Sequence, residues 1–279
     1  MTRYFGQKFK HSLSYVLLSL ASCIVAFPVL WMLAISFRSN LETFSLPPRL
    51  LPETFITEAY INILTNPTYL RFFLNSYLIG IMVTIFSVAL GALAGYGFSR
   101  FDFRGHRIMG MFIVVTQMIP PITLLIPYFA MIVALRLYDN YAGLIVTYTS
   151  FTLPYSVLML TGYFQTISRE LDEAAIIDGC SHFRALWNVV LPVALPGIVS
   201  TAIYTFLLSW NEFLFALALT RSTSMRTVPV GIALLMGEIS FKWNEMMSFS
   251  VLGSIPVLIL FLLVQRYFLS GLTAGSVKG

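Results

Sequence analysis

Charged residues are scarce in this sequence. Asp, Glu, Lys and Arg make up only 10% of its 279 residues, whereas 58% are hydrophobic and the mean hydropathy is +0.83. Because soluble domains carry about a quarter charged residues, this composition excludes an ordinary soluble domain. The net charge of +5 is too small to indicate a nucleic-acid-binding surface. The composition therefore predicts an all-α, polytopic membrane protein.

Motifs of catalysis and metal binding are also missing. Cys23 lies in an apolar stretch and Cys180 in a polar one, so the two cysteines predict neither a disulfide framework nor a metal cluster. No glycine is followed by lysine, which excludes the G-x-x-x-x-G-K-[ST] loop that holds ATP phosphates. There is no nucleophile elbow and no H-E-x-x-H motif, and His11, His106 and His182 fall in separate polar segments. We therefore expect no catalytic activity, cofactor or metal site in this chain.

Long apolar stretches, by contrast, fill most of the sequence, and a bilayer-spanning helix needs about 20 such residues. Six stretches qualify, at about residues 12–37, 72–98, 108–135, 141–167, 193–220 and 247–267. An even number of spans places both termini on one side, and a weak excess of Lys and Arg favours the cytoplasm. The sequence thus predicts six transmembrane helices with cytoplasmic termini.

Two patterns predict local features inside these spans. Pro120-Pro121 must break or kink the third helix near the middle of the membrane, because proline lacks the amide donor and clashes with the preceding turn. Gly91 and Gly95 have the G-x-x-x-G spacing that permits close helix packing, which we expect to occur within one subunit.

The most informative segment is a polar stretch, residues 170–192, between the fourth and fifth spans. Glu170, Asp172 and Glu173 suit the first turns of a short helix, where acidic groups complement the helix dipole. Gly179 can end that helix in a left-handed conformation, and Ser181 can cap a second short helix that ends at Pro192. The pattern predicts a helix, a sharp glycine turn and another helix across the end of a bundle.

This segment resembles the EAA loop of ABC-importer permeases. Glu173-Ala174-Ala175 is followed by three residues, Gly179, nine residues and Val189-Val190-Leu191-Pro192, where only the family's Ile position departs, to Val. In that family the loop carries the coupling helix, which docks into a cleft on a cytoplasmic ATPase. The resemblance implies that the ATPase-coupling residues are Glu173, Ala174, Ala175, Asp178 and Gly179.

Further segments extend the resemblance to the whole chain. Residues 209–213 (SWNEF), 227–231 (TVPVG) and the C-terminal 265–279 look like the smaller permease of carbohydrate ABC importers of the maltose-importer type. The resemblance implies a type I permease fold, with an N-terminal part (1–70), a permease core (71–266) and a cytoplasmic tail (267–279) that reaches toward the ATPases.

The same resemblance implies the partners and the mechanism. These are a second homologous permease, two cytoplasmic ABC ATPase subunits that bind ATP and Mg, an extracytoplasmic binding protein, and a carbohydrate moved across the inner membrane by alternating access. Two alternatives stay open at this point. One is an ABC permease for another solute, such as glycerol phosphate, a polyamine or an osmolyte. The other is an ion-coupled secondary carrier, which the shortage of charged residues inside the spans disfavours.

Glu212 is the ionisable residue that lies well inside a predicted span, where a charge costs about 2.5–3.5 kcal/mol. It either lines a translocation pathway with Asn211 or fixes helix packing. On a continuous helix, Leu208, Asn211, Glu212 and Phe215 share one face. We predict that this face looks across a cavity at Gln117 of the third span. Asn211, Glu212 and Gln117 would then meet sugar hydroxyls, and Phe215 the face of a sugar ring.

Overall fold

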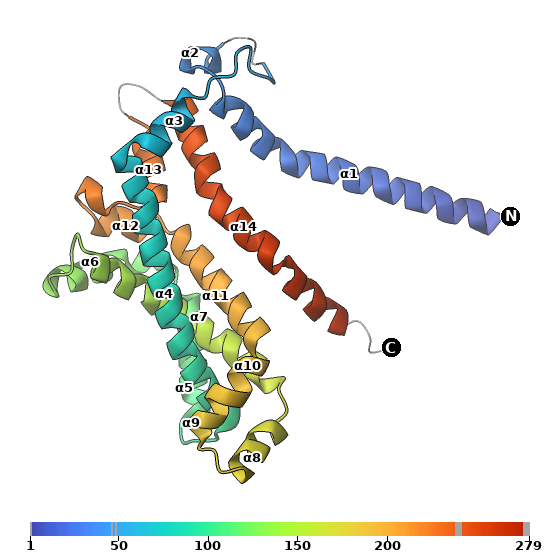
Figure 1. Cartoon of the computed structure of the whole chain (residues 1–279), viewed down its shortest axis with the longest axis vertical. Coiled ribbons are helices and arrows are strands. Elements are labelled where there is room, and N and C mark those ends of the chain that lie inside the picture. Colours follow the sequence, from blue (N-terminus) through green and yellow to red (C-terminus); the bar gives the residue numbers. More distant parts are fainter. Residues whose placement is uncertain (1, 46, 48, 238–241, 276–279) are drawn as a thin grey trace. The chain divides into compact units, whose positions relative to one another are not determined.

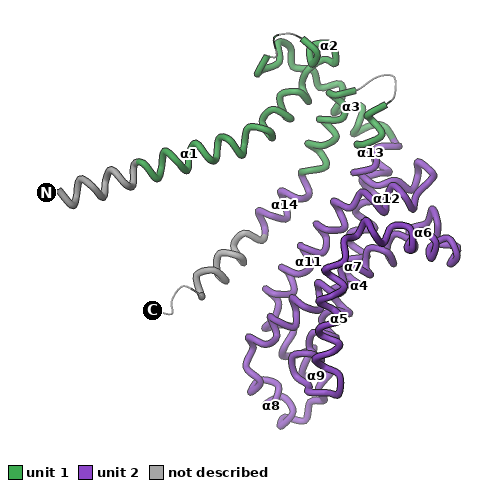
Figure 2. The backbone as a smooth tube through the Cα atoms, turned by 180° about the vertical axis from the view of Figure 1, so that it is seen from behind, with its two compact units in different colours: residues 1–66, 232–254 green, residues 67–231, 255–279 purple. Residues whose placement is uncertain are grey.

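The structure is a computed structural model that describes residues 2–45, 47, 49–237 and 242–275 (Figure 1). Within that part of the chain every long element is a helix. The helices form two compact units, residues 1–66 with 232–254 and residues 67–231 with 255–279, called here the first and the second unit (Figure 2). The boundaries of these units differ from those of the predicted permease core, 71–266, because residues 232–254 pack with the N-terminal part. The permease core itself stays a prediction.

The first unit begins with the long helix α1 (Thr2–Ser36), followed by α2 (Asn40–Thr43) and α3 (Glu58–Thr65). Its other segment carries the start of α14 (Trp243–Gly275). Ser248 donates a hydrogen bond to the Ser36 carbonyl at 3.0 Å, and the Trp243 amide donates to Asn40. These bonds join the end of α1 to the start of α14.

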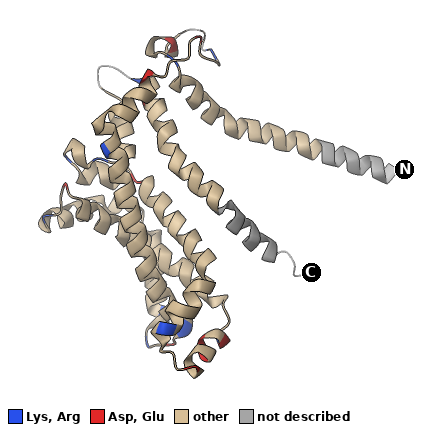
Figure 3. Ribbon diagram, viewed as in Figure 1, with Lys and Arg blue, Asp and Glu red and all other residues tan. Residues whose placement is uncertain are grey.

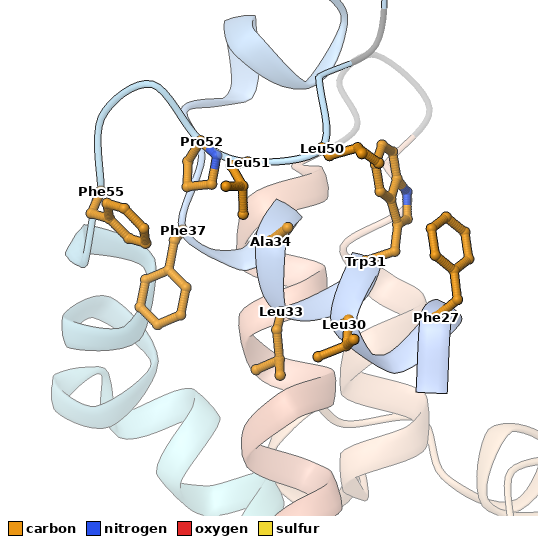
Figure 4. A pocket seen from close by; sticks show the side chains of 10 residues that line it. All are labelled: Phe27, Leu30, Trp31, Leu33, Ala34, Phe37, Leu50, Leu51, Pro52 and Phe55. Carbon is orange, nitrogen blue, oxygen red and sulfur yellow. The ribbon is translucent and has the colours of Figure 1, made fainter. Parts of the chain in front are cut away.

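An apolar pocket of about 490 Å³ lies in the first unit where the loop after α2 folds over the end of α1 (Figure 4). Trp31 and Phe37 come from α1 and its end, and Leu51 and Phe55 from the loop. The most apolar 18-residue window within residues 13–36 has a mean hydropathy of 2.4, and none of that window is buried in this chain. The helix thus presents an apolar surface suited to lipid or to another protein.

The second unit holds the remaining elements and the later part of α14, except that residues 232–234 at the end of α13 belong to the first unit. In chain order they are α4 (Pro67–Arg100), α5 (His106–Met118), η1 (Pro121–Leu124), α6 (Leu125–Ala134), α7 (Tyr141–Gln165), α8 (Glu170–Ile177), α9 (His182–Ala185), the π-helical turn η2 (Leu186–Val190), α10 (Leu191–Val193), α11 (Leu195–Trp210), α12 (Leu214–Leu219), η3 (Thr223–Met225) and α13 (Val228–Leu234). The long helices α4, α7 and α11 form its centre (Figure 1).

Helices α4 and α7 approach closely at the predicted glycine pair. A Cβ atom on Gly91 would lie 2.8 Å from the Ser156 Cβ, and one on Gly95 would lie 3.0 Å from the Thr161 amide nitrogen. Such contacts leave no room for any residue larger than glycine. The prediction of close helix packing within one chain is confirmed.

Four of the predicted spans are found as single helices, whereas the third and the fifth are interrupted. Four helices of the described chain are long and apolar enough to cross a membrane, and two bent pairs bring the total to six. The third span bends by 95° between α5 and η1, which confirms the break at Pro120-Pro121, and a bend of 81° separates α10 from α11. The prediction of a fifth helix from 193 to 220 is wrong, because α11 ends at Trp210 and α12 starts at Leu214.

The structure describes part of the predicted C-terminal tail, 267–279. The backbone of α14 continues to Gly275, so most of the predicted tail is helical. Residues 276–279 lie outside the described residues.

Candidate functional site

The 170–192 segment adopts the predicted helix, turn and helix. Helix α8 ends in a Schellman motif, in which the Cys180 amide donates to the Ala175 carbonyl at 2.9 Å and the Gly179 amide donates to the Ile176 carbonyl at 3.0 Å. Gly179 has φ +88°, a left-handed conformation that favours glycine, and no atom lies within 4 Å of where its Cβ would be. The backbone conformation, rather than lack of space, requires glycine here.

The second helix of the segment starts as predicted, because the Ser181 side chain accepts a hydrogen bond from the Arg184 amide at 3.4 Å. The helix runs through η2 and α10 to Val193, one residue beyond the predicted end. Phe183 and Trp187 stack at 6.3 Å between ring centroids, and both are exposed. An apolar aromatic surface therefore adjoins the glycine turn.

The predicted coupling residues lie on different faces of α8. Glu173, Ala174, Asp178 and Gly179 are exposed, whereas Ala175 is buried. Ile177 is 85% exposed, which is unusual for a large apolar side chain beside acidic groups. The exposed face is thus partly acidic and partly apolar, whereas Ala175 packs into the chain.

Sequence reasoning missed a buried ion pair beneath this segment. The Arg100 Nε lies 2.9 Å from the Asp172 Oδ2, and the Tyr96 hydroxyl donates to Asp172 Oδ1 at 2.7 Å. The sequence predicts Asp172 in the first turns of a helix, where it complements the helix dipole, and indicates no side-chain partner for it. Arg100 and Asp172 lie 72 positions apart, and no local pattern in the sequence links them. Basic and acidic residues of the second unit gather at this end (Figure 3).

Glu212 occupies the break between α11 and α12. Its Oε1 accepts from the Phe215 amide at 2.8 Å and its Oε2 from the Ala216 amide at 2.9 Å, so the carboxylate caps α12. Asn211 donates to the Leu207 carbonyl at 2.8 Å and ends α11. The predicted continuous face through these residues is wrong, because both side chains bond to backbone groups at helix ends.

Phe215 does not have the surface position that a sugar-stacking residue needs. Its side chain is 1% exposed and lies in a core cluster, where it stacks on Phe151 at 5.8 Å and meets Tyr128 edge-on at 5.4 Å. Gln117 is exposed and donates to the Phe151 carbonyl at 3.3 Å. The structure therefore brings Gln117 near the Phe151–Phe215 contact, whereas Asn211 bonds within its own helix.

The opposite end of the second unit, where α4 and α7 begin, has its own polar network. Asp139, in the turn before α7, accepts hydrogen bonds from the amides of Arg221 and Ser222 and from the Ser222 hydroxyl. Burial by itself would raise the pKa of Asp139, but the hydrogen bonds from Ser222 and Arg221 outweigh it and hold the pKa below its usual 3.8. Asn75 of α4 donates to the carbonyls of Ser224 and Arg226, each at 2.8 Å.

A metal site is not formed by the described residues, since no group of three or more His, Cys, Asp or Glu side chains comes together among them. The described site thus consists of an exposed helix–turn–helix, a buried ion pair below it and two capped helix ends.

The model of a protein family, described as binding-protein-dependent transport system inner membrane component, matches residues 87–273. The chain belongs to this family. Within it, the inner membrane ABC transporter permease protein YcjP of Escherichia coli (strain K12) is 37% identical over 268 residues, which are 95% of each chain. The trehalose/maltose transport system permease protein MalG of Thermococcus litoralis is 38% identical over 263 residues, covering 93% of this chain and 94% of that one.

A solved bacterial ABC transporter involved in the import of the acidic polysaccharide alginate has the same fold. Its matched chain gives a TM-score of 0.79 at 23% identity, covering 94% of this chain and 98% of that one. Together with the family match, this likeness makes the chain a multi-pass ABC importer permease.

Proposed function

We propose that this permease is one half of the translocation pathway of a sugar importer. Its 170–192 segment would receive the movement of an ATPase subunit and pass it to the spans, which alternate between outward-facing and inward-facing states. The partners are a second homologous permease, two cytoplasmic ATPase subunits that hold ATP and Mg, and an extracytoplasmic binding protein. Both termini and the 170–192 segment lie in the cytoplasm in this proposal.

The observation that carries the proposal is the shape of α8 and its turn. Glu173 and Asp178 expose carboxylates near the exposed Ile177, and there is open space where a Cβ of Gly179 would lie. A protruding helix end with an apolar tip and acidic flanks is suited to a cleft on a soluble partner. The EAA spacing through Ala174 and Ala175 supports the ATPase as that partner.

A sugar substrate is supported by the trehalose/maltose transport named for the T. litoralis relative. The test is uptake of radiolabelled trehalose, maltose and glucose in proteoliposomes that contain both permeases, the ATPase and the binding protein. We expect ATP-dependent uptake of at least one of these sugars. Uptake of glycerol 3-phosphate or spermidine instead would replace the sugar assignment, and uptake that persists without ATPase would indicate an ion-coupled carrier.

Gln117 and Asn211 remain the proposed polar groups of the pathway, because both are exposed within a membrane-embedded bundle. For Glu212 and Phe215 we propose a supporting role, consistent with the cap on α12 and the buried ring. Gln117→Ala and Asn211→Ala should each raise the KM for sugar about fivefold, as expected for a lost hydrogen bond of about 1 kcal/mol. Unchanged KM values and sugar preference in both variants would show that neither Gln117 nor Asn211 contacts the sugar.

A further inference from the structure

The ion pair between Arg100 and Asp172 is almost completely removed from solvent. The two side chains are only 6% and 8% exposed. Taking two charges out of water is costly, and apolar residues in the same place often give equal or greater stability. A buried pair of this kind therefore calls for an explanation other than stability.

Every nitrogen of the Arg100 guanidinium has a separate partner. Nε bonds to Asp172, one terminal nitrogen donates to the Phe164 carbonyl at 3.0 Å, and the other donates to the Ile167 carbonyl at 3.1 Å. The Tyr96 hydroxyl binds the second oxygen of Asp172. Because the guanidinium is a rigid planar fork, these bonds fix the orientation of the Arg100 side chain as well as its distance from each partner.

The residues of this network come from the ends of three helices and the segment between α7 and α8. Tyr96 and Arg100 end α4, Phe164 and Ile167 lie at the end of α7 and just beyond it, and Asp172 is in the first turn of α8. A further bond, from Arg169 to the Ser99 carbonyl at 3.1 Å, joins the residue before α8 to α4. The start of α8 is thus tied to the ends of both long helices.

The remainder of α8 has no comparable ties on its outer face. Asp172 and Ala175, three positions apart, are buried, whereas Glu173 and Ile177, four positions apart, are exposed. One face of the helix is therefore attached to α4 and α7, and the other is open to a partner. This division separates the part that receives movement from the part that transmits it.

We propose that Tyr96, Arg100 and Asp172 act as a clamp that makes α8 move as one body with the ends of α4 and α7. Displacement of α8 by the ATPase is then passed directly to two membrane helices. The inference rests on the proposed docking of α8, and it assigns positioning roles to residues outside the EAA pattern. A loose α8 would still dock, but its movement would be absorbed before it reached the spans.

The test uses the complete importer with the double substitution Arg100→Met and Asp172→Leu, which leaves no unpaired buried charge. We measure assembled complex, ATP hydrolysis stimulated by loaded binding protein, and uptake of the best-transported sugar of the panel above. Assembly and hydrolysis should persist while sugar moved per ATP falls about tenfold, within the usual range of coupling free energies. The control is Arg107→Gln, an exposed residue that loses the same charge as Arg100→Met alone. If the double variant moves as much sugar per ATP as the parent, the clamp is refuted and the ion pair has only a structural role.

A second measurement does not depend on what is transported. Spin labels at Gly97→Cys on α4 and Ile177→Cys at the end of α8, in a background without Cys23 and Cys180, report the distance between the two helices. Both sites have room for a label, since nothing lies within 4 Å of a Cβ at Gly97 and Ile177 is 85% exposed. The distance distribution should be narrow in the parent and in Arg107→Gln, and broad in the double variant.

The two measurements separate the possible failures. Lack of uptake by the parent importer would reject the sugar proposal. The distances between the spin labels would still test the clamp, because they do not depend on transport. If the double variant does not assemble, Arg100→Lys takes its place, because it keeps the charge but cannot reach all three acceptors. An unchanged distance distribution and an unchanged ratio in that variant would equally reject the clamp.

Discussion

The two ends of the second unit are held together in different ways. At the α8 end, a buried ion pair joins three helix termini, and the bonded groups are side chains and helix-end carbonyls. At the opposite end, Asp139 and Asn75 bond mainly to the backbone of the loop after α12. The first arrangement ties helices to one another, whereas the second holds a loop in place.

Helix α4 runs between these two networks. Asn75 and Arg100 lie 25 residues apart on it, which corresponds to about 37 Å of helix. Between them, Gly91 and Gly95 bring α4 against α7 with no room for a Cβ. A closely packed helix pair is stiff. We therefore expect a movement imposed at the α8 end to reach the opposite end of the unit, near Asn75, with little decrease in amplitude.

The sharpest test of this comparison is whether the two ends face opposite sides of the membrane. Single cysteines at Ser181 and Thr223, both exposed, are treated with an impermeant thiol reagent in intact cells lacking Cys23 and Cys180 in the permease. We expect complete labelling at 223 and none at 181 until the membrane is permeabilised. The reverse result would contradict the cytoplasmic placement of α8 and with it the coupling proposal.

Gly179→Asp should abolish uptake while the protein remains in the membrane. It places a side chain and a charge at φ +88°, where the left-handed conformation costs about 1–2 kcal/mol, and it alters the turn that enters the partner. Uptake and membrane content are measured together. Gly179→Asn, which has nearly the same shape without the charge, is the matched control and should retain more activity. Normal uptake by the Asp variant at normal membrane content would refute the docking role.

Glu212→Gln distinguishes a helix cap from a pathway residue. The Gln side chain keeps one oxygen as an acceptor, but its NH2 group faces the second backbone amide, which is also a donor. We therefore expect a loss of about 1–3 kcal/mol in stability. Thermal unfolding of the purified complex should show a lower Tm and less assembled permease, with the transport rate per assembled complex preserved. A normal Tm together with altered sugar preference would instead return Glu212 to the pathway.

The smallest expected effect on stability concerns Asp139, at the end of the second unit opposite α8. The lowered pKa of Asp139 means that its ionised form stabilises the fold above the usual value of 3.8, and this contribution is lost as the pH falls through the lower folded-state pKa. Asp139→Asn should therefore cost about 1 kcal/mol at neutral pH. The difference in Tm between the two proteins should shrink below pH 3.8. A difference that does not change with pH would show that the charge is not responsible.

The features that were predicted correctly from the sequence depend on neighbours along the chain. The Gly179 turn, the Ser181 cap and the break at Pro120-Pro121 each follow from backbone chemistry within a few residues. The long apolar stretches reflect the lipid that surrounds a membrane helix. The fold class and the approximate positions of the membrane spans were therefore predictable as well. The expected face through Asn211 and Phe215 was wrong because a helical period was carried across a break that side-chain caps create.

The sequence by itself determined that the chain is a helical membrane protein with one polar segment of defined shape, because hydropathy and local backbone preferences act over short distances. Only the tertiary structure decided that Arg100 meets Asp172, 72 residues away, and that Asp139 meets Ser222, 83 residues away. The physical reason is that a buried charge requires a partner, but its identity depends on which helix ends the packing brings together. The close fit of α4 on α7 places the ends of these two helices side by side, and with them the residues of the proposed clamp.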